Sequence, residues 1–283
     1  MSDSELIFLI ERISGSFPSA VVGAIVALTF SIVLSITARR KLPIAHSVAI
    51  LGFPRSGKTT LITSLFAEVF ARNINFVSIT PRGESTINRV NEDIARLENG
   101  ETLGPTTDQD LFAYRAELRL GRGFFSKRYK FEVGDFPGED TEKFAAESDR
   151  WLHESSYFKW AMEADAFVFV IDLGKVLDDN ISASYRAHVS SAFRASWQKL
   201  KDHHYDGEFE LSRKPVVLVF SKLDLLSERK KDSITDEYSE LIRYFESESR
   251  YFRVVFTSAY QRTRERGGVR QGMDDLLRGV LPR

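Results

Sequence analysis

The fold of this chain is decided by the stretch GFPRSGKT, residues Gly52 to Thr59. It fits the pattern GxxxxGK[ST], which forms a phosphate-binding loop when it joins a strand to a helix. The apolar run His46–Leu51 comes directly before it, and the amphipathic segment Lys58–Ala71 begins at its end. We therefore predict a strand, a loop whose N–H groups cradle a phosphate, and a helix whose positive end faces the same ligand.

The side chains of this loop have separate expected roles. Lys58 would bridge the β- and γ-phosphates of a nucleoside triphosphate, and Thr59 would place its hydroxyl on Mg²⁺. The other interpretation, a glycine-rich turn without a ligand, is disfavoured by the position between strand and helix. The expected nucleotide contacts here are Gly52, Arg55, Ser56, Gly57, Lys58, Thr59 and Thr60.

Downstream of the loop, strand patterns alternate with helix patterns. Ala166–Asp172 and Pro215–Ser221 are almost continuously apolar, which is typical of strands covered on both faces. Leu111–Leu120 alternates apolar and polar residues, as a half-exposed strand does. The other expected elements are strands Phe76–Thr80, Tyr129–Val133 and Tyr251–Thr257, and helices Thr86–Glu98, Ile181–Lys201, Ser233–Glu246 and Met273–Val280. This order predicts an α/β domain over residues 46–283, with a mostly parallel sheet and helices on both faces.

Two polar segments have the chemistry to sense a γ-phosphate. Asp135-Phe136-Pro137-Gly138 follows a strand; Asp135 can hold Mg²⁺ through water and the Gly138 N–H can reach the γ-phosphate. Thr106 lies in the polar run Gly104–Thr107 and can bind Mg²⁺ while a γ-phosphate is present, so that hydrolysis would release the loop. We expect Thr59, Thr106 and Asp135 as metal ligands.

Guanine specificity is predicted from Ser221-Lys222-Leu223-Asp224, which follows an apolar strand. Asp224 can accept from guanine N1–H and from the exocyclic amine, whereas adenine N1 would leave the carboxylate unpaired; this disfavours an ATPase. The aliphatic stem of Lys222 would cover the base. Ser258 and Ala259, at the end of the last strand, can offer a backbone N–H to guanine O6.

The N-terminal 45 residues have a different composition. Ala20–Thr37 is apolar on every face and would span about 27 Å as a helix. We predict an anchor over residues 1–45 with a transmembrane helix at about 18–38, rather than a buried helix or a cleaved signal peptide. The segment has no polar stripe and no basic start. Basic residues follow it at positions 39–41, so a single-pass topology would place the following domain in the cytoplasm, with the lipid bilayer as a partner.

These motifs resemble the TRAFAC-class GTPases over roughly residues 46–283. The resemblance implies a P-loop NTPase fold of the Ras-like G-domain type, binding of GTP and GDP, and Mg²⁺-dependent hydrolysis to GDP and phosphate. It also implies a molecular switch read by a protein effector or regulator. The DFPGE form at Asp135, the GPTT loop at Gly104 and the anchor are most similar to prokaryotic double-GTPase-type proteins. The anchor also resembles that of the β subunit of the signal-recognition-particle receptor.

Some positions depart from this class. Ser221 stands in place of the usual Asn or Thr, Pro54 in place of a glycine, and Glu139 in place of the glutamine that orients water. The Glu139 carboxylate could act as a base or repel the γ-phosphate, so a GTP-bound scaffold that does not hydrolyse its nucleotide is the alternative function. For a hydrolase, the expected catalytic residues are Lys58, Thr106, Gly138 and Glu139.

Three remaining features bear on partners. The net charge of −1 gives no reason to expect nucleic acid, and the absence of cysteine excludes disulfides and thiolate metal sites. Residues 73–103 read as an insertion before Thr106, which could form a partner surface or be a decoration of this lineage. After the base-binding segment comes a basic run, which we interpret as a solvated loop, with lipid or effector contact as the alternative: Arg262, Arg264, Arg266 and Arg270.

Overall fold

The computed structural model describes residues 21, 23–32, 44–101, 103, 113–121, 126–135, 160–204, 211–226, 230–259 and 270–281. The chain divides into two units, Met1–Pro43 and Ile44–Arg283. In the first unit, residues 21 and 23–32 are helical and exposed, and the Thr29 hydroxyl lies 2.6 Å from the Ile25 carbonyl oxygen of its own helix. Within the described ranges, no helix has both the length and the apolar character needed to cross a bilayer. The predicted span at about 18–38 lies partly outside those ranges.

The second unit is built on a seven-stranded sheet in the order β2-β3-β4-β1-β5-β6-β7. Four of its pairings are parallel and join β4, β1, β5, β6 and β7; the pairings β2–β3 and β3–β4 are antiparallel. The mostly parallel α/β sheet predicted from the sequence is therefore confirmed. The strands are β1 (Ile44–Gly52), β2 (Val77–Pro81), β3 (Ala113–Leu120), β4 (Lys127–Asp135), β5 (Ala166–Asp172), β6 (Val216–Ser221) and β7 (Phe252–Phe256).

The parallel strands bring their carboxyl ends to one edge of the sheet. Ile50 of β1 is the register partner of Asp135, and Asp172 of β5 is the partner of Ser221. The chain first leaves β1 for the β4 side and later crosses to β5, so the order reverses between β1 and β5. In open α/β sheets, ligands bind beyond the carboxyl ends of the strands at such a reversal.

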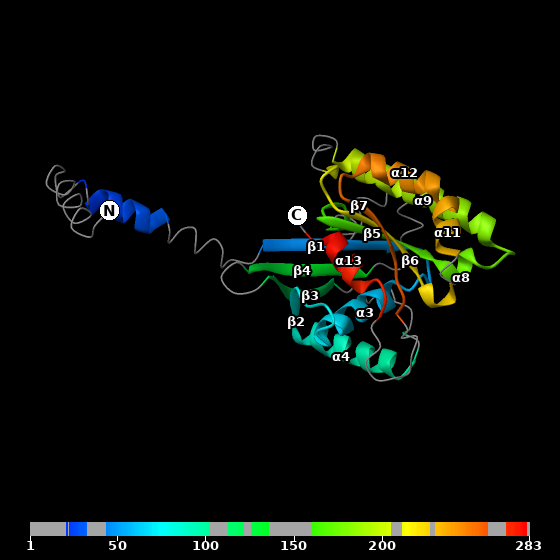
Figure 1. Ribbon diagram of the computed structural model, residues 1–283, viewed down its shortest axis with the longest axis horizontal. Coiled ribbons are helices and arrows are strands. Elements are labelled where there is room, and N and C mark those ends of the chain that lie inside the picture. The colour runs from blue at the N-terminus through cyan, green and yellow to red at the C-terminus, as the bar shows by residue number, and fades with distance from the viewer. Residues whose placement is uncertain are drawn as a thin grey trace, which may run out of the picture. The chain divides into compact units, whose positions relative to one another are not determined.

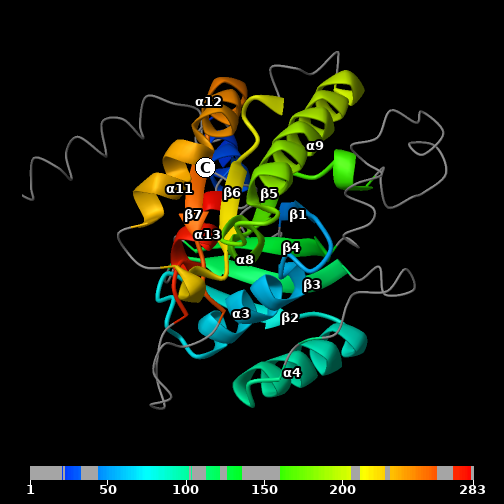
Figure 2. The ribbon, with the colours of Figure 1, turned by 90° about the vertical axis from the view of Figure 1, so that its right-hand side faces the viewer.

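Helices cover both faces of the sheet (Figures 1 and 2). Helices α9, α11 and α12 lie on one face; α3 and α13 lie on the other, with α4 packed against α3. Their bounds are α3 (Lys58–Phe70), α4 (Glu84–Glu98), α8 (Leu173–Val176), α9 (Ser182–His203), α11 (Lys231–Glu237), α12 (Ser239–Glu248) and α13 (Met273–Val280), with the 3-10 turn η3 (Leu223–Leu225).

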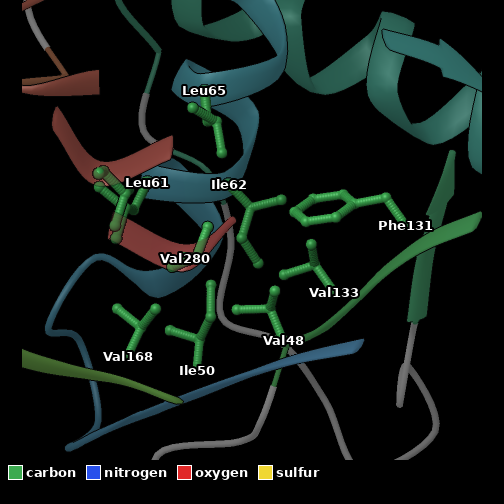
Figure 3. Close-up of a pocket in the computed structure, with 10 residues that line it drawn as sticks. Val48, Ile50, Leu61, Ile62, Leu65, Phe131, Val133, Val168 and Val280 are labelled. Atoms are coloured by element: carbon green, nitrogen blue, oxygen red, sulfur yellow. The ribbon is translucent and has the colours of Figure 1, made fainter. Parts of the chain in front are cut away.

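Two buried clusters fill the space between the sheet and its helices. The cluster on the α9 side is rich in aromatic rings, among them Phe169, Phe193, Trp197 and Phe245. The cluster on the α3 side is mainly aliphatic, and Figure 3 shows a small pocket in it lined only by apolar side chains. Because both faces are buried, β5 and β6 need the continuous apolar runs that the sequence shows.

Two short elements differ from the sequence-based expectation. The single helix predicted at Ser233–Glu246 is wrong, because α11 and α12 are separated at Tyr238, whose buried ring packs on Phe220 at 5.3 Å. The single turn α8 was not predicted. It begins where the Asp172 carboxylate accepts from the Gly174 N–H at 2.8 Å, which is an N-cap interaction. Residues 73–103, predicted to be an insertion, contain β2 and α4.

Candidate functional site

The loop between β1 and α3 wraps around a lysine ammonium group. Lys58 is buried at the first position of α3, and its Nζ donates to the carbonyl oxygens of Gly52 at 2.7 Å and Phe53 at 3.2 Å. Gly57 has φ +85°, a left-handed conformation that glycine adopts without strain, and caps α3. The predicted phosphate loop therefore has its cation and helix N-terminus on the same side of the β1 end.

Side chains from α8 and α9 fix the outer side of this loop. The ring of Phe53 is 2% exposed and lies 4.9 Å from the ring of His188 and 6.0 Å from that of Phe193. Lys175 Nζ donates to the Pro54 carbonyl oxygen at 3.3 Å. An aromatic residue at the second loop position thus anchors the phosphate loop to the core, which limits the movement of its N–H groups.

Ser221 connects the predicted base-recognition segment to the phosphate loop. Its hydroxyl lies 2.8 Å from the Ser56 carbonyl oxygen and 3.1 Å from that of Ile171, and it can donate to either. Ser221 is 5% exposed, so its hydroxyl is largely shielded from water, and a hydrogen bond there is stronger than one in solvent. The serine at this position therefore still joins the two motifs directly.

A buried carboxylate that sequence reasoning missed fixes Lys222. Asp172 ends β5, its side chain is 3% exposed, and its Oδ2 lies 2.6 Å from Lys222 Nζ. The same ammonium donates to the Arg55 carbonyl oxygen at 3.3 Å. A polar residue ending an apolar strand beside Ser221 was the available signal, because neighbouring parallel strands share one carboxyl edge.

Asp224 lies in η3 and is held by a residue of the last loop. The Ser258 hydroxyl donates to Asp224 Oδ1 at 3.0 Å. Backbone bonds align the two segments: Leu223 N–H donates to Thr257 O at 2.9 Å, and Thr257 N–H to Phe220 O at 2.9 Å. The structure thus brings together the predicted base-reading residues Lys222, Asp224, Ser258 and Ala259 beyond the ends of β6 and β7.

The residues predicted to sense the γ-phosphate are described only in part. Thr106, Gly138 and Glu139 lie outside the described residues, as does the side chain of Asp135. The Asp135 backbone ends β4 beside β1, and Thr59 lies with Thr60 in the first turn of α3. A hydroxyl and a carboxylate are hard oxygen donors of the kind that Mg²⁺ binds, so this donor set fits that ion.

The interpretation of the basic run as a solvated loop is wrong for one of its residues. Arg270 is 5% exposed, and its Nη1 lies 3.2 Å from Oε1 of Glu68, which is 1% exposed. The other three arginines, at positions 262, 264 and 266, lie outside the described residues. Composition could not separate Arg270 from its neighbours, because its burial depends on a carboxylate about two hundred positions away.

A strand–loop–helix unit with the GxxxxGK[ST] pattern lies at the carboxyl edge of a parallel sheet, and Ser221 joins it to the segment predicted to read the base. This arrangement defines the class of P-loop nucleotide-binding α/β proteins. Comparison with known families then narrows this class. The sequence profile of the family Double-GTPase 2 matches residues 46–277, and the chain belongs to this family. The predicted resemblance to P-loop GTPases of the double-GTPase type is confirmed.

Other comparisons add little. None of the curated protein sequences compared with the chain matches it. Among solved structures, the chain is similar to the crystal structure of the bacterial selenocysteine-specific elongation factor EF-Sec, with 17% sequence identity and a TM-score of 0.38. That similarity covers 84% of this chain and 28% of the elongation factor chain.

Proposed function

We propose that this chain binds GTP and GDP with Mg²⁺, hydrolyses GTP to GDP and phosphate, and acts as a nucleotide-dependent switch. The observation that carries the proposal is the hydrogen bond from Ser221 to the Ser56 carbonyl oxygen, 2.8 Å long. It holds the carboxyl end of β6 directly against the loop between β1 and α3. One nucleotide could therefore be held at its phosphates by the loop and at its base by Asp224.

The residues at the carboxyl edge of the sheet would each contact a different part of the nucleotide. Lys58 would stabilise the charge on the β- and γ-phosphates, and the N–H groups of the loop and of α3 would bind the same oxygens. Asp224, oriented by Ser258, would accept from the guanine N1–H and amine. Bound Mg²⁺, held by Thr59, Asp135 and Thr106, would supply charge neutralisation at the β- and γ-phosphates.

The hydrolytic step rests on residues next to Gly138. Glu139 would position or deprotonate the attacking water, and loss of the γ-phosphate would free Thr106, so that an effector could distinguish the two nucleotide states. If the Glu139 carboxylate instead repels the γ-phosphate and prevents hydrolysis, the chain is a GTP-bound scaffold. Phosphate release by the purified protein separates these functions, because a scaffold shows no turnover.

We also propose a membrane location for this switch. The supporting feature is the uncharged stretch between Arg12 and Arg39, followed by three basic residues. The described helical residues of this stretch include Thr29, whose hydroxyl can be satisfied by the Ile25 carbonyl oxygen of its own helix. Protease added outside intact cells should leave residues 46–283 uncut; digestion of that domain would contradict a cytoplasmic location.

Base recognition is tested by the substitution Asp224→Asn. Xanthine replaces the guanine amine with a carbonyl oxygen, so the wild-type carboxylate would face an oxygen, whereas an asparagine amide can donate to it. The variant should lose affinity for GTP by roughly tenfold or more and gain affinity for xanthosine triphosphate, measured by competition binding. Asp236→Asn, an exposed position on α11, is the matched control. An unchanged preference in Asp224→Asn would mean that this residue does not read the base.

A further inference from the structure

A buried ion pair lies behind the base-reading loop, outside the expected nucleotide contacts. Glu68 Oε1 accepts from both the backbone N–H of Arg270 at 3.1 Å and its Nη1 at 3.2 Å. Glu68 Oε2 accepts from Asn73 Nδ2 at 2.7 Å. With 1% and 5% of the two side chains exposed, the pair is almost wholly removed from water.

Arg270 also bonds directly to the base-reading segment. Its Nε donates to the Ala259 carbonyl oxygen at 3.1 Å. One residue further along, the Gln271 carbonyl oxygen accepts from the Ser258 N–H at 3.2 Å. The segments 257–259 and 270–272 are therefore tied together side by side.

Gly272 makes this arrangement tight. It has φ +77°, and a Cβ at this position would lie 2.1 Å from the Phe256 carbonyl oxygen. The backbone at residue 272 thus approaches the end of β7 as closely as only glycine allows. Because Arg270 bonds to both Glu68 and Ala259, a displacement of its side chain away from Ala259 would also disturb the Glu68 pair.

The acidic partner of this ion pair, Glu68, lies in the helix that follows the phosphate loop. Glu68 belongs to α3, whose first turn carries Lys58 and Thr59. A rigid helix links these groups, so the pair connects the phosphate-binding element to the base-binding element from behind. Burying two charges is unfavourable unless their hydrogen bonds are well satisfied, and removing one partner of such a pair leaves the other charge buried and uncompensated.

We propose that Arg270 and Glu68 are positioning residues for the guanine base. Arg270 holds the Ala259 carbonyl and Gln271 holds the Ser258 N–H, so the peptide group between them, which carries the Ala259 N–H, is held in place for a hydrogen bond to guanine O6. Glu68 fixes Arg270 relative to α3. This inference rests on the proposed guanine-binding function. It assigns the two residues a role in base affinity that acts through Ala259 and not through contact with the nucleotide.

The test compares GDP with 6-thioguanosine diphosphate in the full-length chain. Sulfur in place of O6 is a weaker acceptor, so the ratio of the two affinities reports the contact to O6 while the other base contacts stay the same. Arg270→Lys keeps a positive charge opposite Glu68 but lacks the fork that serves Glu68 and Ala259 together. It should weaken GDP binding by roughly three- to tenfold and bring the ratio closer to one.

Controls separate positioning from a purely structural role. Arg243→Lys, exposed on α12, should leave both affinities unchanged. If Arg270→Lys does not fold, the double variant Glu68→Gln with Arg270→Gln removes both buried charges together and takes the same measurement. A lower thermal midpoint with an unchanged GDP to 6-thio-GDP ratio would overturn the positioning role. A wild-type chain that does not prefer GDP over ADP would overturn the proposed function itself, and the positioning role with it.

Discussion

The two faces of the central sheet are packed with different chemistry. On the α9 face, Phe169 is surrounded by the rings of Phe193 at 5.0 Å, Phe245 at 4.8 Å and Trp197 at 6.4 Å. On the α3 face the buried side chains are mostly aliphatic, but charged and titratable groups lie among the buried residues there. The Glu68–Arg270 pair is one such group, and His46, which bonds to the Val280 carbonyl oxygen at 2.7 Å, is another.

Because of this difference, the two faces of the sheet have different structural roles. The aromatic face anchors the phosphate loop mainly by ring packing, in which Phe53 lies against His188 and Phe193. The α3 face connects α3, the segment 257–259 and the C-terminal helix α13 through polar groups, whose hydrogen bonds require a defined geometry. Substitutions on the first face should therefore affect stability, and those on the second face should also affect binding or pH dependence.

The largest effect is expected on the aromatic face. Phe169→Ala removes a fully buried ring from a cluster of three others and should lower the free energy of unfolding by about 4 kcal/mol. Phe70→Ala, at the end of α3 with 38% of Phe70 exposed, is the matched control and should lose much less. Urea unfolding of both variants measures the difference. Equal losses would mean that the ring cluster on the α9 face is not the more tightly packed region.

On the α3 face, Glu68→Gln should have the next largest effect. It leaves the Arg270 guanidinium buried without a countercharge, which typically destabilises a protein by about 3 kcal/mol. Glu240→Gln provides the comparison, because Glu240 is 88% exposed and its 3.6 Å pair with Arg194 should contribute almost nothing. Thermal and urea unfolding would record both. A loss below about 1 kcal/mol for Glu68→Gln would show that water reaches Arg270.

The contrast between the faces also explains how much the sequence could predict. Continuous apolar runs specify β5 and β6, and the GxxxxGK[ST] pattern specifies the turn into α3, because both depend on local spacing. The break at Tyr238 was not predictable, since the pattern is equally compatible with one helix or two. Tyr238, which stands between the two helices, is buried with its ring 5.3 Å from that of Phe220, and sequence spacing does not show this contact.

For the candidate site, the motifs predict which residues contact the nucleotide, but they do not predict which side chains hold those residues in place. The positions of Lys58, Ser221 and Asp224 follow from motif spacing. Asp172 and Arg270 act through partners that are 50 and 202 positions away in the chain, and only the fold brings these partners together. The burial of Arg270 within a run of arginines shows this most clearly, because composition alone indicates a solvated loop.

A smaller, pH-dependent effect is expected from His46. Burial lowers the pKa of this side chain below the ordinary value of 6.5, although the Val280 carbonyl and the Asp165 carboxylate partly oppose the shift. The unfolded chain therefore takes up a proton at a higher pH than the native one. Stability is fully present above about pH 6.5 and falls as the pH drops below it, by at most about 1.4 kcal/mol per pH unit.

His46→Gln isolates this contribution. Glutamine retains an N–H that can donate to Val280 but does not titrate, so the variant should lack this part of the stability loss below about pH 6.5. The measurement is the free energy of unfolding of both proteins in urea at a series of pH values. Parallel curves for the two proteins would place the acid sensitivity elsewhere in the chain.

The smallest predicted effect comes from the apolar pocket on the α3 face, which encloses about 10 Å³ and is lined by Val168 of β5 (Figure 3). The register partner of Val168 on β6 is Val217, equally buried but not part of the pocket lining. A Cβ at Gly279 would lie only 2.8 Å from Val217, so the space beside Val217 is already filled.

Val168→Ile should gain up to about 0.8 kcal/mol in unfolding free energy, the value of one buried methylene group, whereas Val217→Ile should lose about 1 kcal/mol through overpacking. Urea midpoints of the two variants in parallel decide this. If both substitutions destabilise the protein to the same extent, the pocket is too small to accept a methyl group and the two positions are packed alike.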